Sequence, residues 1–265
     1  MKLFQRLTRQ VSLTDEGERI FEILQNAMGE LSEALEQSSQ AEVAGSIALY
    51  VRPSIAQCWL VPRLADFVER YPLVSLDLRV GNDNVDFRTR KIDLALYYAN
   101  GEFPGLTSHR LMREQLAPVC SPDYARRHRL QENPENLRHC TTLHDSLAWD
   151  HAAYDAEWTL WAEQHNLLAA LPKRTLTFDR SDLSVTAAMN HAGIAIGRQQ
   201  LVQKRVDRGE LVLPLAGFSR SGHYDYYLVH PPLDTLPKRL LVFMNWLREC
   251  ASQSSPLGTN EDLLG

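Results

Sequence analysis

Two short stretches place an arginine and a serine where the chain turns from a predicted strand into a predicted helix. Arg52-Pro53-Ser54 follows the strand-like run 46–51, and Arg180-Ser181 follows the strand-like run 174–178. Free amides and the helix dipole favour an anion at a helix start, and a guanidinium suits a carboxylate. The two turns therefore predict a site for a carboxylate. Two alternatives stay open: Ser54 could act only as a helix cap, and either arginine could be a surface ion-pair partner.

A third polar group follows the strand predicted over 73–80. It consists of Asn82, Asp83 and Asn84 in the sequence GNDN. Three polar side chains in a row at a strand end suit a polar ligand better than an aromatic one. The same residue types also form ordinary turns, and turn chemistry alone would explain them equally well.

The elements that would hold these turns alternate along the chain after a hinge at 41–45. Apolar alternation and turn residues predict strands at 46–51, 73–80, 92–98, 116–120, 174–178, 193–197 and 223–230. Helices are predicted at 54–71, 86–91, 157–167, 181–192 and 238–251. This alternation indicates an α/β fold with mostly parallel, doubly wound sheet, long enough for two small lobes. Ligands in such sheets bind beyond the strand carboxyl ends, which is where the polar turns lie.

The first forty residues have a different character. Residues 1–13 form a basic, strand-like ribbon with Lys2, Arg6 and Arg9, and a helix capped by Thr14 is predicted over 14–40. One face of that helix is apolar, which predicts a coiled-coil seam with a second copy of the chain. An amphipathic helix packed on its own domain is the alternative. The seam residues are Ile20, Leu24, Leu31 and Leu35.

Composition excludes several classes of protein. The 265 residues are 44% hydrophobic and carry a net charge of −5, so the chain is globular and has no overall basic footprint for nucleic acid. Four scattered cysteines, no signal core and no membrane-length apolar run predict a soluble, cytoplasmic protein. No nucleophile elbow, P-loop or dinucleotide fingerprint is present, which argues against an enzyme. His139, Cys140 and His144 do not complete a metal site, so we expect no metal and no cofactor.

The N-terminal residues resemble the end of the winged helix-turn-helix domain of LysR-type transcriptional regulators. Its pattern LF-x-R-x-x-R-x-V-x-LT-x-x-G is matched by Leu3, Phe4, Arg6, Arg9, Val11, Leu13, Thr14 and Gly17. The resemblance implies that 1–13 is the wing and 14–40 the dimerisation helix. Residues 45–118 and 223–251 would form lobe I and 119–222 lobe II of an effector domain with the type II periplasmic-binding-protein layout. Residues 252–265 would form a flexible tail.

The resemblance also bears on DNA and on oligomers. The helices that precede the wing in this family do not occur before Lys2 in this sequence, so we expect no specific operator binding. Lys2, Arg6 and Arg9 would make phosphate contacts, which position a protein without reading bases. The family implies a homodimer or homotetramer, no membrane association, and an effector that shifts the balance between closed and open lobes.

Longer strings resemble one branch of the family, the activators of D-serine deaminase genes. They include RPSIAQCWLVP, GNDN, IDLALYY, PVCSPDYARRH, FDRSDL and LVQKR. D-serine would need carboxylate donors, ammonium acceptors and a partner for its hydroxyl. Arg52, Ser54, Arg180 and Ser181 would meet the carboxylate, Asp83, Asp182 or Asp145 the ammonium, and Asn82 or Asn84 the hydroxyl.

Aromatic walls for this ligand are expected from Tyr97, Tyr98, His144 and Trp149, with Trp59 as a further candidate, although residues of these types more often belong to the core. The alternatives are a regulator that senses another small amino acid or hydroxy acid, and a plain two-lobed solute-binding protein. The basic ribbon, the seam and the missing signal core argue against the solute-binding protein.

Overall fold

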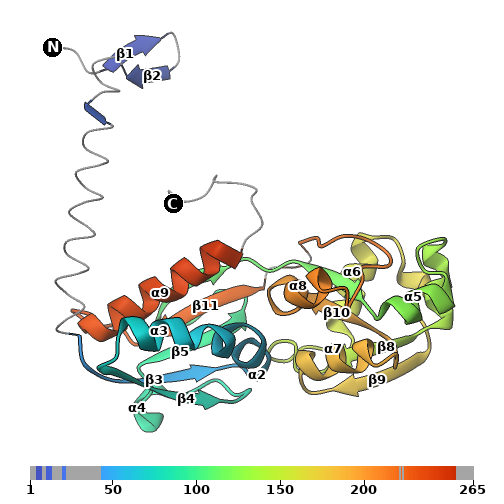
Figure 1. Ribbon diagram of the computed structural model, residues 1–265, viewed down its shortest axis with the longest axis horizontal. Coiled ribbons are helices and arrows are strands. Elements are labelled where there is room, and N and C mark those ends of the chain that lie inside the picture. The colour runs from blue at the N-terminus through green and yellow to red at the C-terminus, as the bar shows by residue number, and fades with distance from the viewer. Residues whose placement is uncertain are drawn as a thin grey trace.

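The computed structural model of the chain describes residues 4–7, 10–13, 20–21, 43–220, 222 and 224–254 (Figure 1). At the N-terminal end, β1 (Phe4–Leu7) pairs antiparallel with β2 (Gln10–Leu13). The pair falls where the sequence predicts a basic ribbon, and its assignment to a wing stays a prediction.

Most of the predicted DNA and dimer contacts lie outside the described residues. This applies to Lys2, Arg9 and the side chain of Arg6, and to the seam residues Leu24, Leu31 and Leu35. Ile20 lies in a described helical pair, residues 20–21. The linker helix over 14–40 and its seam therefore remain predictions.

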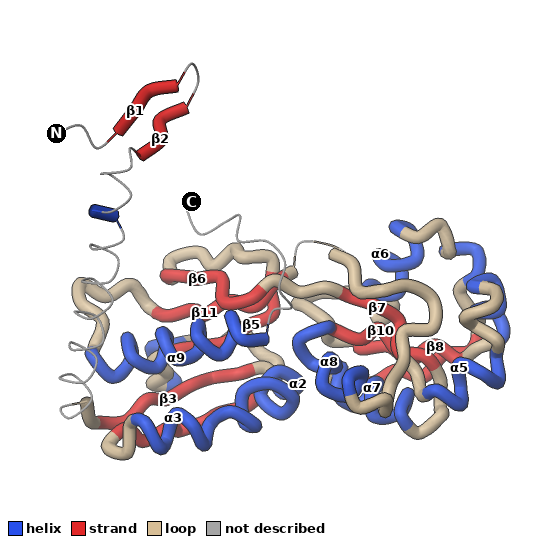
Figure 2. The backbone as a smooth tube through the Cα atoms, turned by 45° about the horizontal axis from the view of Figure 1, so that its top comes forward, coloured by secondary structure: helices blue, strands red, loops and turns tan. Residues whose placement is uncertain are grey.

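Lobe I is built on a five-stranded sheet with the order β4-β3-β5-β11-β6. Its strands are β3 (Gly45–Val51), β4 (Val74–Val80), β5 (Leu94–Ala99), β6 (Thr107–Met112) and β11 (Asp225–His230). Its main helices are α3 (Leu64–Arg70) and α9 (Lys238–Ser254), which lie side by side over one face of the sheet (Figures 1 and 2). A short helix, α4 (Phe87–Arg90), follows β4.

Lobe II is built on a four-stranded sheet with the order β7-β10-β8-β9. The strands are β7 (Leu116–Val119), β8 (Thr141–Asp145), β9 (Arg174–Phe178) and β10 (Ile194–Arg198). The helices are α5 (Pro122–His128), α6 (Ala156–Gln164), α7 (Ser181–Met189) and α8 (Gln199–Asp207). Two 3₁₀ segments, η3 (Pro134–His139) and η4 (Leu168–Ala170), connect them.

Both sheets are mixed, which corrects the expectation of mostly parallel sheet. β3 pairs parallel with β4 and β5, and β8 pairs parallel with β9 and β10. β11 runs antiparallel to β5 and β6, and β7 runs antiparallel to β10. The antiparallel strands are those next to the two crossings between the lobes.

The first crossing lies earlier than the sequence predicts. Residues 116–118, assigned to lobe I, belong to β7, which pairs with β10 in the lobe II sheet. A strand pattern shows that a strand exists but not which sheet it joins, and this explains the error. The end of α9 was also placed too early, because the helix continues to Ser254 instead of giving way to a tail at 252.

The helix predicted over 54–71 is a run of four helical segments. It comprises α2 (Pro53–Ile55), a π-helical turn η1 (Ala56–Leu60), a 3₁₀ turn η2 (Val61–Arg63) and α3. The backbone N–H of Val61 bonds to the carbonyl of Ala56, five residues earlier. Pro62 has no N–H to continue a regular ladder, so the change of helix type coincides with it.

The core of lobe I lies between its sheet and the α3–α9 layer. The ring centroids of Phe67 and Phe243 lie 4.8 Å apart in an edge-on arrangement, and both rings contact Trp246. The indole N–H of Trp246 donates to Asp66, which ties α9 to α3 at 2.7 Å. This packing fixes β3, and with it the turn that carries Arg52 and Ser54.

Candidate functional site

The turn after β3 carries the first predicted binding residues. Arg52 is the N-cap residue of α2, and its guanidinium donates to the Asn82 carbonyl and, at 2.8 Å, to the Asp150 carboxylate of lobe II. The arginine is thus an ion-pair partner as the alternative reading expected, and its partner lies on the opposite lobe.

Ser54 faces the other predicted turn, which comes from lobe II. Its hydroxyl donates to Asp182 Oδ1 at 2.8 Å, and the backbone N–H of Asp182 donates back to Ser54 Oγ at 3.3 Å. Arg180 donates to the same carboxylate through Nε at 3.0 Å and Nη2 at 2.7 Å, and it also donates to Gln57 of lobe I. The structure therefore brings the two predicted turns together, with the Asp182 carboxylate between them.

A narrow inner cleft lies beside this contact. Its cavity volume is about 20 Å³, close to the space that one ordered water occupies. Five of the predicted binding residues line it: Arg52, Ser54, Asn82, Asp145 and Arg180. The predicted residues thus converge from both lobes, but the space between them is nearly closed.

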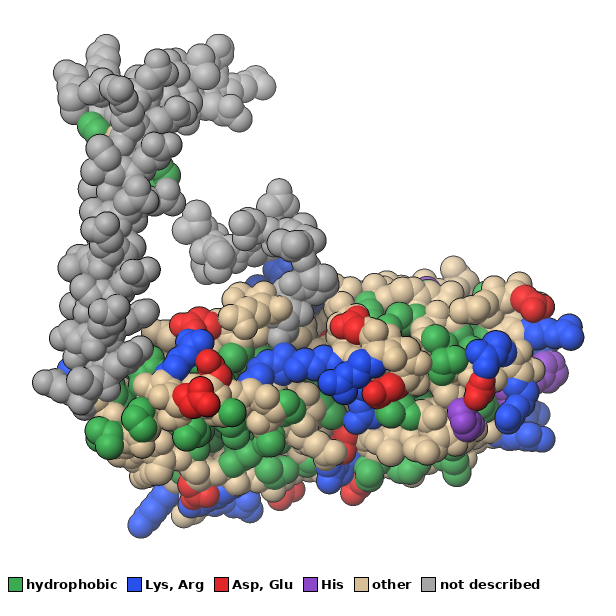
Figure 3. Space-filling view, viewed as in Figure 1, with side chains coloured by type: hydrophobic (Ala, Val, Ile, Leu, Met, Phe, Trp, Pro, Cys, Tyr) green, Lys and Arg blue, Asp and Glu red, His purple; other side chains and the backbone are tan. Residues whose placement is uncertain are grey.

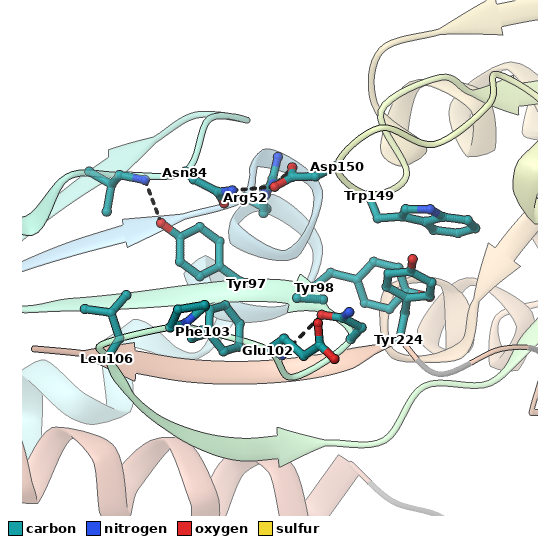
Figure 4. A pocket seen from close by; sticks show the side chains of 14 residues that line it. Arg52, Asn84, Tyr97, Tyr98, Glu102, Phe103, Leu106, Trp149, Asp150 and Tyr224 are labelled. Carbon is teal, nitrogen blue, oxygen red and sulfur yellow. Dashed lines mark hydrogen bonds and ion pairs between the residues drawn. The ribbon is translucent and has the colours of Figure 1, made fainter.

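A wider outer cavity of about 280 Å³ opens next to the inner cleft (Figure 4). Tyr97 and Phe103 stack on its lobe I side with centroids 5.9 Å apart, and Trp149 stacks on Tyr224 across from them at 4.2 Å. The cavity is also lined by side chains of both charges and by two amides, one of them the predicted Asn84. These polar residues are Arg52, Asn84, Asn100, Glu102 and Asp150.

Some predicted residues do not reach either cavity. Asp83 is exposed, and Ser181 is fully buried with a hydroxyl that makes no hydrogen bond among the described residues. His144 is buried in lobe II, where its Nε2 lies 2.9 Å from the Thr142 hydroxyl, and Trp59 is fully buried in the lobe I core. His144 and Trp59 are therefore core residues and not walls of the site.

Sequence reasoning missed Arg198, the last residue of β10. Its side chain is 6% exposed, and it donates to Glu157 at 2.8 Å and to Asp145 at 3.1 Å. Its guanidinium carbon lies 4.3 Å from the ring centroid of Tyr98. Burial raises the pKa of both acids, and the Arg198 charge opposes that shift. The strand-end rule that found the other turns would have found Arg198 too, because it directly follows the predicted strand 193–197.

The hinge between the lobes holds a second group that the sequence did not indicate. Glu114 is 3% exposed, and its Oε1 accepts from the backbone N–H of Gln115 at 2.9 Å and of Gln200 at 3.2 Å. Burial raises its pKa to about 7, against those two hydrogen bonds. Its buried Oε2 lies beside the buried hydroxyl of Tyr226. Tyr226 also lines the inner cleft.

Other features narrow the chemistry. Among the described residues, no group of three or more His, Cys, Asp or Glu side chains is placed to hold a metal ion, and no helix could cross a membrane. Acidic and basic side chains are interspersed over both lobes on the face shown in Figure 3. The arrangement suits reversible binding of a small polar ligand between two lobes.

Comparison with known proteins identifies the family. A family model described as the LysR substrate binding domain matches residues 40–252. The HTH-type transcriptional regulator DsdC of Escherichia coli K12 is 45% identical over 255 residues, which cover 96% of this chain and 81% of that protein. The chain belongs to the LysR family. It is a transcriptional regulator and not an enzyme.

Other LysR relatives and structures agree. The glycine cleavage system transcriptional activator of Escherichia coli K12 is 29% identical, over 93% of this chain and 78% of that protein. The effector domain of AmpR of Pseudomonas aeruginosa is 25% identical and superimposes with a TM-score of 0.64, over 80% of this chain and 96% of that domain. CrgA of Neisseria meningitidis gives a TM-score of 0.65 at 22% identity, over 94% and 83% of the two chains, which shows a shared fold.

These matches confirm the predicted LysR effector-binding fold, with its type II periplasmic-binding-protein layout. Regulators of this family bind small effectors and DNA and form oligomers. The convergence of Arg52, Ser54 and Arg180 between the lobes of this LysR chain is a structural fact. The predicted role of each residue in ligand binding stays a prediction.

Proposed function

We propose that this LysR regulator is a cytoplasmic activator of D-serine catabolism genes whose effector, D-serine, binds between the two lobes. The observation that carries the proposal is the meeting of Ser54 and Arg180, from different lobes, around one carboxylate. A hydroxyl and a guanidinium fork are the donors that an amino acid carboxylate needs. The support for D-serine in particular is the resemblance to the activators of D-serine deaminase genes and the 45% identity to DsdC.

The effector's route follows from the two cavities. The inner cleft holds about one water, so a ligand the size of serine must enter through the outer cavity and part the lobes. Parting them breaks the contacts Arg52–Asp150, Ser54–Asp182 and Arg180–Gln57. A ligand that replaces these bonds shifts the balance between open and closed lobes by its difference in affinity for the two states.

In the opened cleft, we assign the carboxylate to Ser54, Arg180 and Arg52. The ammonium would lie near Asp145, where burial of several acids around a single buried arginine favours a cation. Asn82 lines the inner cleft and Asn84 lines the outer cavity, and either would take the serine hydroxyl. Asp83 and Ser181 lie away from both cavities, and we leave them out of the proposed site.

The outer cavity favours a second candidate class of effector. At about 280 Å³ and with five aromatic side chains in its lining, it has room for an amino acid larger than serine. The aromatic rings would cover a hydrophobic side chain, while Asp150 and Glu102 at its edge would meet an ammonium. A larger D-amino acid is therefore the alternative.

A thermal-shift titration tests the proposal. D-serine, L-serine, D-alanine, D-threonine and D-phenylalanine are compared on the purified chain. A ligand at a hundred times its dissociation constant stabilises the folded state by about 2.7 kcal/mol, which is measurable as a rise in melting temperature. A rise with D-serine and little with L-serine supports the proposal. A rise with D-phenylalanine alone favours the larger effector, and no rise with any amino acid removes the D-serine assignment.

The oligomeric part of the proposal rests on the seam at the N-terminal end. We expect a homodimer or homotetramer held in part by Ile20, Leu24, Leu31 and Leu35, with effector-driven lobe movement passed to the DNA-binding ends. Light scattering with and without D-serine measures the assembly.

A further inference from the structure

The Asp182 carboxylate accepts hydrogen bonds from Ser54 and Arg180, two of the side chains that the proposed site offers to the effector's carboxylate. Ser54 Oγ donates to it from lobe I, and Arg180 donates twice from lobe II, at distances between 2.7 and 3.0 Å. Asp182 is 4% exposed, and Ser54 is 7% exposed. The carboxylate is therefore shielded from water and bound as an amino acid ligand would be.

The local helix does not require this arrangement. Asp182 lies in the first turn of α7, where a negative charge is favourable. Its carboxylate accepts two hydrogen bonds from Arg180, the N-cap residue of α7, and one from the hydroxyl of Ser54 on the opposite lobe. The hydrogen bond from Ser54 serves the contact between the lobes.

The cleft beside the Ser54–Asp182 contact is too small for a carboxylic acid ligand. Ser54 and Arg180 both line the inner cleft, whose volume is about 20 Å³. That volume holds about one water molecule, so no carboxylic acid fits there while the lobes stay in contact. A carboxylate ligand and the Asp182 carboxylate therefore compete for the same donors.

We propose that the Asp182 carboxylate is an internal stand-in for the effector's carboxylate, which closes the cleft of the ligand-free protein and is displaced on binding. This inference rests on the proposed function, since it takes the effector to be a carboxylic acid bound between the lobes. It also replaces the sequence-based assignment of Asp182 to the effector's ammonium. If Asp182 competes with ligand, its removal strengthens binding, whereas removal of an ammonium acceptor weakens binding.

The competition makes the contact a specificity determinant. Only a ligand that supplies its own carboxylate can satisfy both Ser54 and Arg180 after Asp182 leaves, because the buried Ser54 hydroxyl would otherwise lose its acceptor and Arg180 its ion-pair partner. Ligands with an ammonium and a hydroxyl but no carboxylate gain nothing from displacing it. Selection for carboxylic acids therefore follows from the cost of opening the closed form.

The test compares the wild-type chain with Asp182→Asn and Asp182→Ala. Isothermal titration uses three probes: D-serine, glycolate, which lacks the ammonium, and ethanolamine, which lacks the carboxylate. We expect affinity for D-serine and glycolate to rise about tenfold or more, with the larger rise in Asp182→Ala, and affinity for ethanolamine to stay unchanged. Asp123→Asn is the matched control, because Asp123 also lies in the first turn of a lobe II helix and pairs with an arginine, Arg126.

A ligand-free measurement accompanies the titration. Amide hydrogen exchange is followed at the start of α2 and the start of α7, which carry the two halves of the contact. Faster exchange at both sites in Asp182→Asn than in wild type and Asp123→Asn supports the inference. Equal exchange rates overturn it, because they show that the contact does not hold the lobes together.

The outcomes for the two proposals are separable. A fall in D-serine or glycolate affinity in Asp182→Asn, with an unchanged melting temperature, overturns the inference while leaving the D-serine assignment in place. If neither wild type nor variant binds any probe, the D-serine assignment fails, and the exchange rates alone decide whether Asp182 closes the cleft.

Discussion

Glu114 gives the hinge a pH dependence whose sign and size can be worked out. Its carboxyl has an ordinary pKa of 4.5, and burial raises the folded value to about 7. A group whose folded pKa is raised stabilises the protein fully below the unfolded pKa and loses that contribution as the pH rises through the folded pKa. The step from 4.5 to about 7 corresponds to roughly 3 kcal/mol, at about 1.4 kcal/mol for each pH unit.

Glu114→Gln removes this titration and keeps the shape of the neutral acid. The amide oxygen can accept from the same two backbone N–H groups that Oε1 bonds now, those of Gln115 and Gln200. We expect the variant and the wild type to have similar unfolding free energies near pH 5. Near pH 8.5 the variant should be more stable by about 3 kcal/mol, because the wild-type hinge then carries a buried charge.

The assay is urea unfolding followed by tryptophan fluorescence at several pH values. The difference between the two proteins is the informative quantity, since the raised pKa values of Asp145 and Glu157 affect both equally. Glu163→Gln, at an exposed helical position, serves as the control, and its unfolding free energy should match that of the wild type at every pH. A difference that does not change with pH, or a wild type that gains on Glu114→Gln as the pH rises, would refute the reasoning.

Three further predictions follow from other parts of the chain. Arg198→Met leaves two buried carboxylates without their cation, and should lower the unfolding free energy at pH 7 by about 3–5 kcal/mol in urea titrations, with a smaller loss at pH 5. Gly197→Ala places a methyl within 3.0 Å of valine side chains on β7 and α8, and should cost about 1–3 kcal/mol by thermal unfolding, whereas Gly217→Ala, in open space, should be neutral. Replacing Leu24 and Leu31 with glutamate should dissociate the linker helices, and an unchanged mass by light scattering would place the assembly elsewhere.

The fold could be predicted from sequence where a strand or helix carries its own pattern. Period-two alternation marked β4, and an apolar run marked β5, because both strands have a buried face. β6 and β8 could not be predicted in this way. The sequence TSHRLM of β6 has no clear alternation, because β6 lies at a sheet edge where half-exposed side chains are tolerated. Whether β7 joins lobe I or lobe II depends on pairing with β10, a contact between residues about eighty positions apart, which no local pattern encodes.

The site could be predicted in part for a similar reason. Arg52, Ser54 and Arg180 could be predicted because each follows a recognisable strand, and ligands of such folds bind beyond the carboxyl ends of strands. Glu114 and Tyr226 could not be found, because they meet only where the chain crosses between the lobes. The role of Asp182 was also not visible, since its partner Ser54 lies 128 residues away.

The distribution of burial among the interlobe contacts decides which of them controls the cleft. The Arg52–Asp150 pair is half open to water on the acid's side, and exposed pairs of this kind contribute about 1 kcal/mol or less. The Ser54–Asp182 contact is buried on both sides, so breaking it without a replacement leaves desolvated groups unsatisfied. Opening is therefore governed by the contact at which the effector's carboxylate is proposed to bind. Affinity and switching then cannot be tuned separately, because a change that loosens Asp182 makes binding tighter and also opens the cleft when no effector is present.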